Sequence, residues 1–157
     1  MKNSMRKGFS FGLTSGIITT LGLIVGLHSS THSSFVILGG VLVIAVADAL
    51  SDSLGMHVSE ESENQHTTRE IWESTLITFI TKFFVALTFV VPILLLPLNT
   101  AILVSVAWGL SLITFFNFHM AVQQKAKPFR VVMEHLAIAI FVIFVTHFIG
   151  DLVATFV

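Results

Sequence analysis

Apolar residues fill five long stretches of this chain, and short polar segments separate them. The stretches cover residues 9–28, 35–58, 74–97, 100–119 and 131–156. Each is long enough for a helix that crosses a bilayer, which takes about 20 residues. The pattern predicts an all-α integral membrane protein with five transmembrane helices, forming a single transmembrane domain over residues 1–157.

The connecting segments predict how these helices follow one another. Residues 97–100 contain Pro and Asn and predict a tight turn, so helices three and four form an antiparallel hairpin. Residues 28–34 form a short polar loop between helices one and two. Residues 59–73 form a short acidic connector that could extend helix two, and no separate soluble domain is expected.

The basic residues predict the orientation of the chain in the membrane. All but one of them fall before helix one, between helices two and three, or between helices four and five, which is one side of the membrane. The positive-inside rule assigns that side to the cytoplasm. We therefore expect the N-terminus inside and the C-terminus outside. The residues concerned are Lys2, Arg6, Lys7, Arg69, Lys125, Lys127 and Arg130.

Composition excludes several classes of protein. Hydrophobic residues make up 54% of the chain and charged residues only 11%, against about 25% charged in soluble domains. The net charge of −1 argues against a nucleic-acid partner, which requires a basic face. Cysteine is absent, so disulfides and thiolate metal sites are excluded. The lipid bilayer is the expected surrounding.

Two carboxylates interrupt the second apolar stretch. Asp48 and Asp52 lie four residues apart and therefore share one face of the predicted helix, and Met56 continues that stripe. A charge near the bilayer centre costs roughly 2.5–3.5 kcal/mol on insertion scales, which favours a functional role. Carboxylate and thioether ligands suit Fe²⁺, Mn²⁺ or Co²⁺. The alternative is that both carboxylates are neutralised by structural contacts.

Lys82 is the one basic residue inside a predicted span. Counting about nine residues from the cytoplasmic ends of helices two and three places it at the depth of Asp48. We expect an Asp48–Lys82 contact that leaves Asp52 free for an ion. Lys82 would then act as a counter-ion, or would give way when a cation arrives.

The acidic connector offers a second candidate metal site. Glu63, His66, Glu70 and Glu73 are spaced by three, four and three residues, which gives one stripe if the segment is helical. We interpret Glu63, His66 and Glu70 as a cytosolic docking site for metal, with His57 between it and the aspartates. The alternative is a solvated acidic face.

Histidines near the other side of the membrane are candidates for proton exchange. His147 and Asp151 lie four residues apart in helix five, and His28 and His32 flank the first loop. Histidine changes charge near neutral pH and can accept a proton or release a metal. The alternative is a set of interfacial polar residues.

Four polar residues near the cytoplasmic ends of helices four and five are interpreted as interfacial or helix-end residues. They are Asn117, His119, Glu134 and His135.

The first two helices carry sequence motifs of a known family. Residues 11–16, running into 21–27, resemble the first helix of the vacuolar iron transporter family, and residues 47–59 resemble its second-helix signature. Five helices with a cytosolic N-terminus, and Pro92 in helix three, are also similar. The resemblance implies that family's fold, a homodimer and transport of a divalent metal.

The chain departs from the family pattern at the ligand positions. Phe11 stands where the family usually has Asp, Asp52 where it has Met, Met56 where it has an acidic residue, and Asp48 where Gly is common. The long cytosolic metal-binding insert is reduced to the connector. The ligand set is therefore rearranged relative to the family.

Helix one contains two Gly-x-x-x-Gly pairs, which let helix backbones approach closely. Because the resemblance places helix one near a two-fold interface, we predict a homodimer interface at these glycines. Ser15 and Thr19 beside them could supply hydrogen bonds or weak ligands along an ion path. The glycines are Gly12, Gly16, Gly22 and Gly26.

These observations predict a secondary transporter that exports a divalent transition metal, Fe²⁺ or Mn²⁺, from the cytoplasm. Proton antiport is the expected driving force, because the sequence has no nucleotide-binding motif. The metal would be the transported substrate, with no tightly bound cofactor. In a prokaryote the membrane would be the plasma membrane.

Three alternatives remain open at this point. The chain could be a non-transporting dimeric membrane subunit in which Asp48 and Lys82 form a structural ion pair. It could carry a different cation, for instance a proton or a monovalent cation, and the carboxylates also suit Mg²⁺ or Ca²⁺. An enzyme is the least expected class, because no arrangement of a nucleophile with a base is evident.

Overall fold

The computed structural model describes residues 3–156, which fold into helices joined by short turns. Five helical stretches are long and apolar enough to cross a membrane, with α3 and α4 together forming the third. The predicted all-α membrane protein with five spans is thereby confirmed. The helices are α1 (Asn3–Thr31), α2 (Ser34–Ser62), α3 (Thr68–Thr88), α4 (Val90–Leu95), α5 (Leu98–Gln123) and α6 (Pro128–Ala154).

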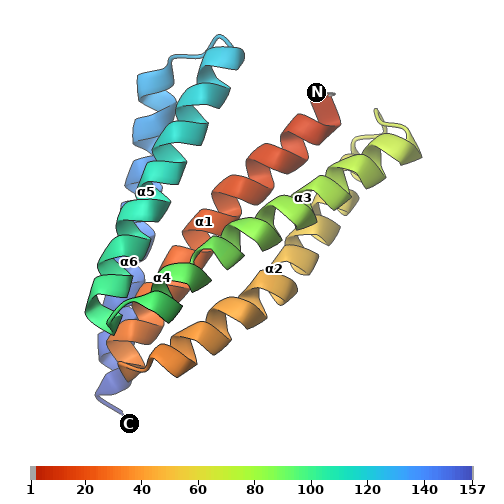
Figure 1. Ribbon diagram of the computed structural model, residues 1–157. Helices are drawn as coiled ribbons and strands as arrows, with labels where there is room; N and C mark the ends of the chain where they lie inside the picture. Colours follow the sequence, from red (N-terminus) through yellow and green to blue (C-terminus); the bar gives the residue numbers. More distant parts are fainter. Residues whose placement is uncertain (1–2, 157) are drawn as a thin grey trace.

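Helix α1 lies at the centre of the molecule. It packs against α2 and α3 on one side and against α5 and α6 on the other (Figure 1). Its buried residues Leu13, Ile17, Leu21 and Ile24 form the middle of the core. Their spacing of three and four residues places them on one helical face, so α1 contributes a continuous apolar stripe.

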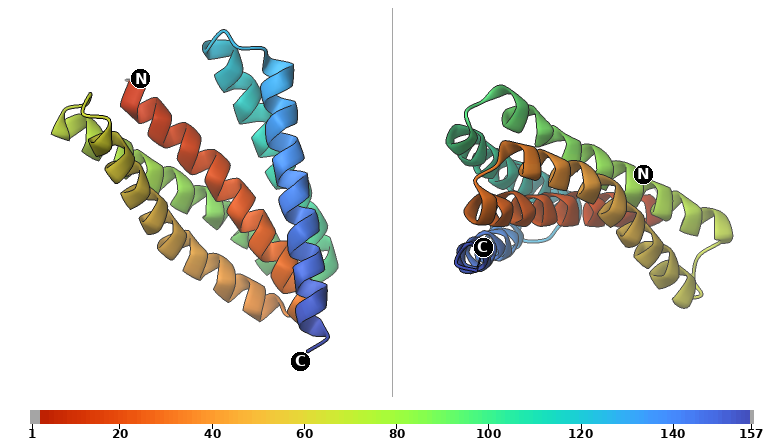
Figure 2. Two further views of the ribbon diagram at one scale, coloured as in Figure 1. Left: turned by 180° about the vertical axis from the view of Figure 1, so that it is seen from behind. Right: turned by 90° about the horizontal axis from the view of Figure 1, so that it is seen from below.

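The helices form two groups that diverge toward the end where α1 begins. Helices α1, α2 and α3 form one group, and the α5–α6 hairpin meets it near the opposite end of the molecule (Figures 1 and 2). We call the end where α1 begins the basic end, because Arg6, Lys7, Arg69 and the 124–127 turn lie there. Lys2, which the sequence also assigns to this side, lies outside the described residues.

The third span is broken, which the sequence pattern did not predict. Helix α3 ends at Thr88 and α4 begins at Val90, with Phe89 between them. Pro92 has no N–H and cannot donate to the carbonyl four residues earlier, so the helix is interrupted one turn before it. Residues 97–100 then make the expected tight hairpin turn into α5.

Two connections are shorter than predicted because the flanking helices extend into them. Helix α1 continues through most of the 28–34 segment, leaving His32 and Ser33 as the turn, and Ser33 caps α2 by accepting a hydrogen bond from the Val36 N–H. The acidic connector is reduced to residues 63–67, because α2 continues to Ser62 and Thr67 caps α3.

The four glycines of α1 contact helices of the same chain. A Cβ at Gly12 or Gly16 would meet Thr78 or Lys82 of α3, and a Cβ at Gly22 or Gly26 would meet α6. The close approach that these glycines allow is therefore made to α3 and α6, rather than to a second copy as the sequence analysis proposed. The tight α1–α3 contact is what brings α1 hydroxyls to Lys82.

We expect Gly12→Ala to destabilise the fold. The added Cβ would lie 2.7 Å from the Thr78 carbonyl oxygen, and such overpacking costs about 1–3 kcal/mol. Gly55→Ala is the matched control, because nothing lies within 4 Å of its added Cβ and an alanine in a helix gains about 1 kcal/mol over glycine. Thermal unfolding of the two variants in detergent tests this, and equal melting temperatures would contradict the packing described.

Candidate functional site

A buried lysine lies between the two aspartates of the second span. The Lys82 Nζ on α3 lies 2.6 Å from Asp48 Oδ2 and also contacts Asp52 Oδ2. The Asp48–Lys82 contact predicted from helix depth is therefore confirmed. The expectation that Asp52 stays free is wrong, because aspartates one helical turn apart allow one ammonium group to reach both.

Hydroxyl groups of α1 complete this cluster. Ser15 donates to Asp52 Oδ2 at 2.7 Å and accepts from Lys82 Nζ at 2.9 Å. Thr19 donates to Asp48 Oδ2 at 2.9 Å. The polar contacts anticipated for Ser15 and Thr19 are thus present, and α1, α2 and α3 each contribute to the cluster.

The cluster carries an excess of negative charge. Two carboxylates and one ammonium give a formal charge of −1 when all three are ionised. The lysine is only 2% exposed, whereas Asp48 and Asp52 are 25% and 24% exposed. A cation that approaches along the exposed side would therefore meet the carboxylates and not the ammonium.

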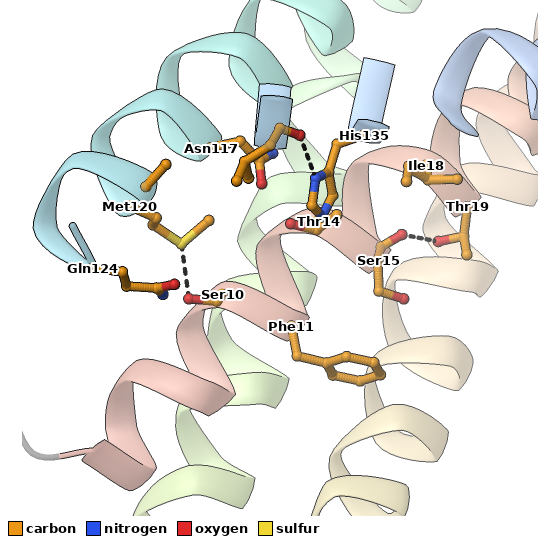
Figure 3. A pocket seen from close by; sticks show the side chains of 12 residues that line it. Ser10, Phe11, Thr14, Ser15, Ile18, Thr19, Asn117, Met120, Gln124 and His135 are labelled. Carbon is orange, nitrogen blue, oxygen red and sulfur yellow. Dashed lines mark hydrogen bonds between the residues drawn. The ribbon is translucent and has the colours of Figure 1, made fainter. Parts of the chain in front are cut away.

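Cavities lead from the basic end toward this cluster. The first, which we call the inner cavity, has a volume of about 470 Å³ and lies between α1 and the α5–α6 hairpin. Ser15 and Thr19 are part of its lining (Figure 3). The second, which we call the outer cavity, has a volume of about 620 Å³ and lies nearer the basic end. The two share Ser10, Phe11 and Gln124, so they adjoin. Together they provide a route to the hydroxyls that bind both aspartates.

Phe11 stands in the wall of both cavities. Its side chain is 42% exposed, and it occupies the position at which the resembled family has an aspartate. An aromatic ring offers no ligand there. Any cation that uses this route must be held by the α2 carboxylates and by other groups of the cavity wall.

A charged cluster lies at the basic end of the route. Lys7 Nζ lies 3.0 Å from carboxylate oxygens of both Glu60 and Glu63. His66 Nε2 lies 3.2 Å from Glu60 Oε2 and 3.5 Å from Glu63 Oε2. The predicted pair Glu63 and His66 is therefore brought together, with Lys7 as a partner that the sequence analysis did not assign to it.

Glu60 is a functional candidate that the sequence analysis missed. Its side chain is only 1% exposed, and it lines the cavity at the basic end together with Met56. The spacing contained the signal, because Asp48, Asp52, Met56 and Glu60 follow one another at intervals of four residues along α2. This stripe runs from the aspartate cluster to the charged cluster.

The predicted stripe of the connector does not form, because the chain turns at residues 63–67. Glu70 lies in the first turn of α3, where its carboxylate accepts hydrogen bonds from the Thr67 N–H at 3.0 Å and the Thr67 hydroxyl at 2.8 Å. This reciprocal cap fixes the start of α3. Glu73 pairs with Arg69 at 2.9 Å.

His57 faces α3 instead of the route. Its Nδ1 lies 3.0 Å from the Thr75 hydroxyl, and its ring contacts Trp72. Because Thr75 donates its hydroxyl hydrogen to the Ile71 carbonyl, the His57 Nδ1 is the donor in this bond. His57 belongs to the α2–α3 contact, and the cavities described above do not include it.

The histidines at the opposite end contact different helices. His28 Nε2 lies 3.2 Å from Asn99 Oδ1 at the start of α5, and its ring lies 5.1 Å from that of His32. His147 contacts the Ser29 hydroxyl of α1 and lies 3.5 Å from Asp151. His147 and Asp151 are both more than half exposed.

The charged cluster predicts a measurable pH dependence. Hydrogen bonding to Lys7 is the main cause that holds the pKa of the Glu63 carboxyl below its usual range, and contact with His66 acts in the same direction. A lowered pKa means that this contact stabilises the fold fully above the usual carboxyl pKa of about 4.3 and is lost as the pH falls through the lowered value. We expect Glu63→Gln to flatten the dependence of melting temperature on pH in that acid range. An unchanged slope would contradict the contact.

Between residues 3 and 156, no group of three or more His, Asp or Glu is arranged so that it could hold a metal ion. The carboxylate pair of α2 is already occupied by Lys82, and Glu60, Glu63 and His66 are occupied by Lys7 and one another. Metal binding through the oxygens that contact Lys82 or Lys7 therefore requires the ammonium group to move away.

The fold and this cluster define the class of protein. It is an integral membrane protein of five spans, with the aspartate cluster of Asp48, Asp52 and Lys82 held between its first three helices. Residues 7–72 match the model of the VIT family, the family that the motifs of α1 and α2 resemble. The match covers less than half of the chain. It supports the resemblance to this family and suggests membrane metal-ion transport. No curated protein matches the chain.

Proposed function

We propose that this protein is a secondary transporter that exports a divalent transition metal, Fe²⁺ or Mn²⁺, from the cytoplasm in exchange for protons. The observation that carries the proposal is the pair Asp48 and Asp52, neutralised in part by one buried lysine and bordered by a cavity route. Charged groups at such depth are costly and are usually retained for ion movement.

Entry of the metal is proposed from the basic end, which the positive-inside rule assigns to the cytoplasm. Glu60, Glu63 and Met56 line the outer cavity and would attract the hydrated cation. The inner cavity then leads to Ser15 and Thr19, whose hydroxyls bind the two aspartates.

Exchange at the aspartate cluster is proposed to follow the charge balance. The ammonium of Lys82 and a divalent cation compete for the same carboxylates. With the ammonium group displaced, the two ionised carboxylates balance the two positive charges of the cation. Protons that arrive from the opposite side would then neutralise the carboxylates and expel the metal. Their later release to the cytoplasmic side would let the ammonium group return, which gives antiport.

His147 and Asp151 are proposed to take part in proton exchange at the opposite end. They lie on the last turns of α6 and are both more than half exposed. Neither is reached by the cavities described at the basic end. Access from the opposite end therefore requires a second conformation, as alternating access demands.

A homodimer is proposed as the assembly, on the resemblance alone. Since the α1 glycines already pack against α3 and α6, a second copy would have to use another surface. Crosslinking or mass determination in detergent tests this independently of transport.

The direct test of the proposed function is metal uptake into proteoliposomes with an imposed pH gradient. We expect Fe²⁺ or Mn²⁺ movement that accelerates with the gradient and moves protons the other way, measured with a pH dye inside the vesicles. Ca²⁺ and Mg²⁺ serve as competing ions, because a carboxylate site also suits them. Metal movement that equals that of empty vesicles would overturn the proposal.

A non-transporting membrane subunit is the second candidate. The observation that favours it is that the three charged groups and both hydroxyls of the cluster contact one another through Asp48 Oδ2 and Asp52 Oδ2. Such a cluster can fix the register of α1, α2 and α3. In that case the proteoliposomes would show no transport, while disruption of the cluster would still unfold the protein.

A further inference from the structure

The wall of the inner cavity opposite the aspartates carries polar side chains within membrane-spanning helices. Asn117 and Met120 lie on α5 and His135 lies on α6, all facing the same cavity (Figure 3). Asn117 is only 1% exposed. The sequence analysis interpreted Asn117 and His135 as interfacial or helix-end residues, but the structure places them beside Thr14 and Ser15 of α1 in the cavity lining.

The hydrogen bond of His135 determines which ring nitrogen has a lone pair. Its Nδ1 lies 2.8 Å from the carbonyl oxygen of Val131, one turn earlier in α6. A carbonyl oxygen can only accept, so Nδ1 carries the hydrogen and Nε2 of the neutral ring is the acceptor. A backbone carbonyl that holds one ring nitrogen in this way is the usual support of a metal-binding imidazole.

Asn117 is held in a comparable way. Its Nδ2 donates to the Ile113 carbonyl at 2.9 Å, one turn earlier in α5. With the amide nitrogen engaged by the backbone, the side-chain oxygen is the atom that Asn117 can offer as a ligand. The cavity wall therefore presents one imidazole nitrogen and one amide oxygen, both oriented by the backbone of their own helices.

The size of the cavity suits a partly hydrated ion. Six water molecules occupy about 180 Å³ at about 30 Å³ each, whereas the cavity holds about 470 Å³. A divalent ion could keep most of its water while it exchanges one or two waters for protein ligands. The −1 charge of the cluster behind Ser15 and Thr19 would attract it.

We propose that His135, assisted by the Asn117 side-chain oxygen, forms a metal-binding site on the α5–α6 side of the cavity, which selects divalent transition metals before they reach Asp48 and Asp52. This deepens the proposed function and rests on it. Carboxylates alone accept Mg²⁺ and Ca²⁺ readily, whereas an imidazole nitrogen favours ions such as Fe²⁺, Co²⁺ and Zn²⁺. The site thus supplies a discrimination that the carboxylates of Asp48 and Asp52 alone do not.

The test compares His135→Gln with His119→Gln in the purified full chain, using Co²⁺ as the probe. His119 is the matched control, because it lies on α5 at the basic end, bonds to Gln123 and does not line the inner cavity. We expect His135→Gln to weaken Co²⁺ binding roughly tenfold or more and to change the visible spectrum of bound Co²⁺. Competition by Mg²⁺ should become correspondingly stronger, and His119→Gln should behave like the unmodified protein.

Each other outcome overturns the proposal. Unchanged Co²⁺ binding in His135→Gln, or an equal loss of Co²⁺ and Mg²⁺ binding, would mean that the imidazole selects nothing. If the variant fails to fold, ¹⁵N-histidine NMR of the unmodified protein decides, because bound paramagnetic Co²⁺ must broaden the His135 signal. If the His135→Gln variant transports metal with unchanged selectivity, this site alone is overturned. If the unmodified protein does not transport metal, the proposed function is overturned.

Discussion

Asp52→Asn is expected to abolish metal transport while leaving the fold intact. The substitution keeps the shape of the side chain and removes one negative charge, so Lys82 and Asp48 remain as a neutral pair with no excess charge to attract a cation. Loss of an outer-shell partner alone can weaken a metal site roughly 10–100-fold, and a direct ligand should cost at least the upper value. Metal flux into proteoliposomes measures this.

Glu134→Gln is the control for that substitution. Glu134 is exposed at the basic end, where it pairs with Arg130 at 2.9 Å, and it lines none of the cavities on the proposed route. Its flux should equal that of the unmodified protein. Full activity of Asp52→Asn would remove Asp52 from the ion site and leave the cluster with a structural role.

Lys82→Met is expected to produce the largest loss of stability. Removing one partner of a buried ion pair leaves uncompensated charge, which costs about 3–5 kcal/mol. Here two carboxylates would face each other across one helical turn, with Ser15 and Thr19 as their remaining donors. Thermal unfolding in detergent should show a melting temperature well below that of the surface control Lys127→Met.

A second substitution in the same background should restore part of that stability. The double variant Lys82→Met with Asp48→Asn removes one of the two facing charges, so it should be more stable than Lys82→Met alone. Such non-additivity is the signature of residues in direct contact. Effects that simply add would argue against the Asp48–Lys82 pair in the folded protein.

The aspartate cluster shows where helix depth is a reliable guide and where it is not. Depth along antiparallel helices depends only on rise per residue, so the Asp48–Lys82 contact could be predicted. The sharing of one ammonium by Asp48 and Asp52 could not, because it depends on the rotation of α2 and α3 about their axes and on the conformation of the long lysine side chain. The position of α3 in turn depends on its close packing against α1 at Gly12 and Gly16.

The α1 glycines and Glu60 also show the difference between what a sequence motif indicates and what helix packing decides. A Gly-x-x-x-Gly pair indicates that some helix approaches closely, but the motif does not say which one, and here the neighbours are α3 and α6 of the same chain. Glu60 lies at the end of a regular four-residue stripe, yet its near-complete burial follows from its contact with Lys7 on α1 and the proximity of His66 in the turn.

The sequence by itself determined the five spans and the presence of costly charges in the second and third of them. Hydrophobic length and charge placement are local properties, and the bilayer imposes the same requirement on each segment separately. Only the tertiary structure decided which charges meet, that the third span breaks before Pro92, and that His135 and Asn117 face a cavity. Those outcomes depend on how five helices rotate and tilt against one another, and that arrangement is a joint property of residues far apart in the chain.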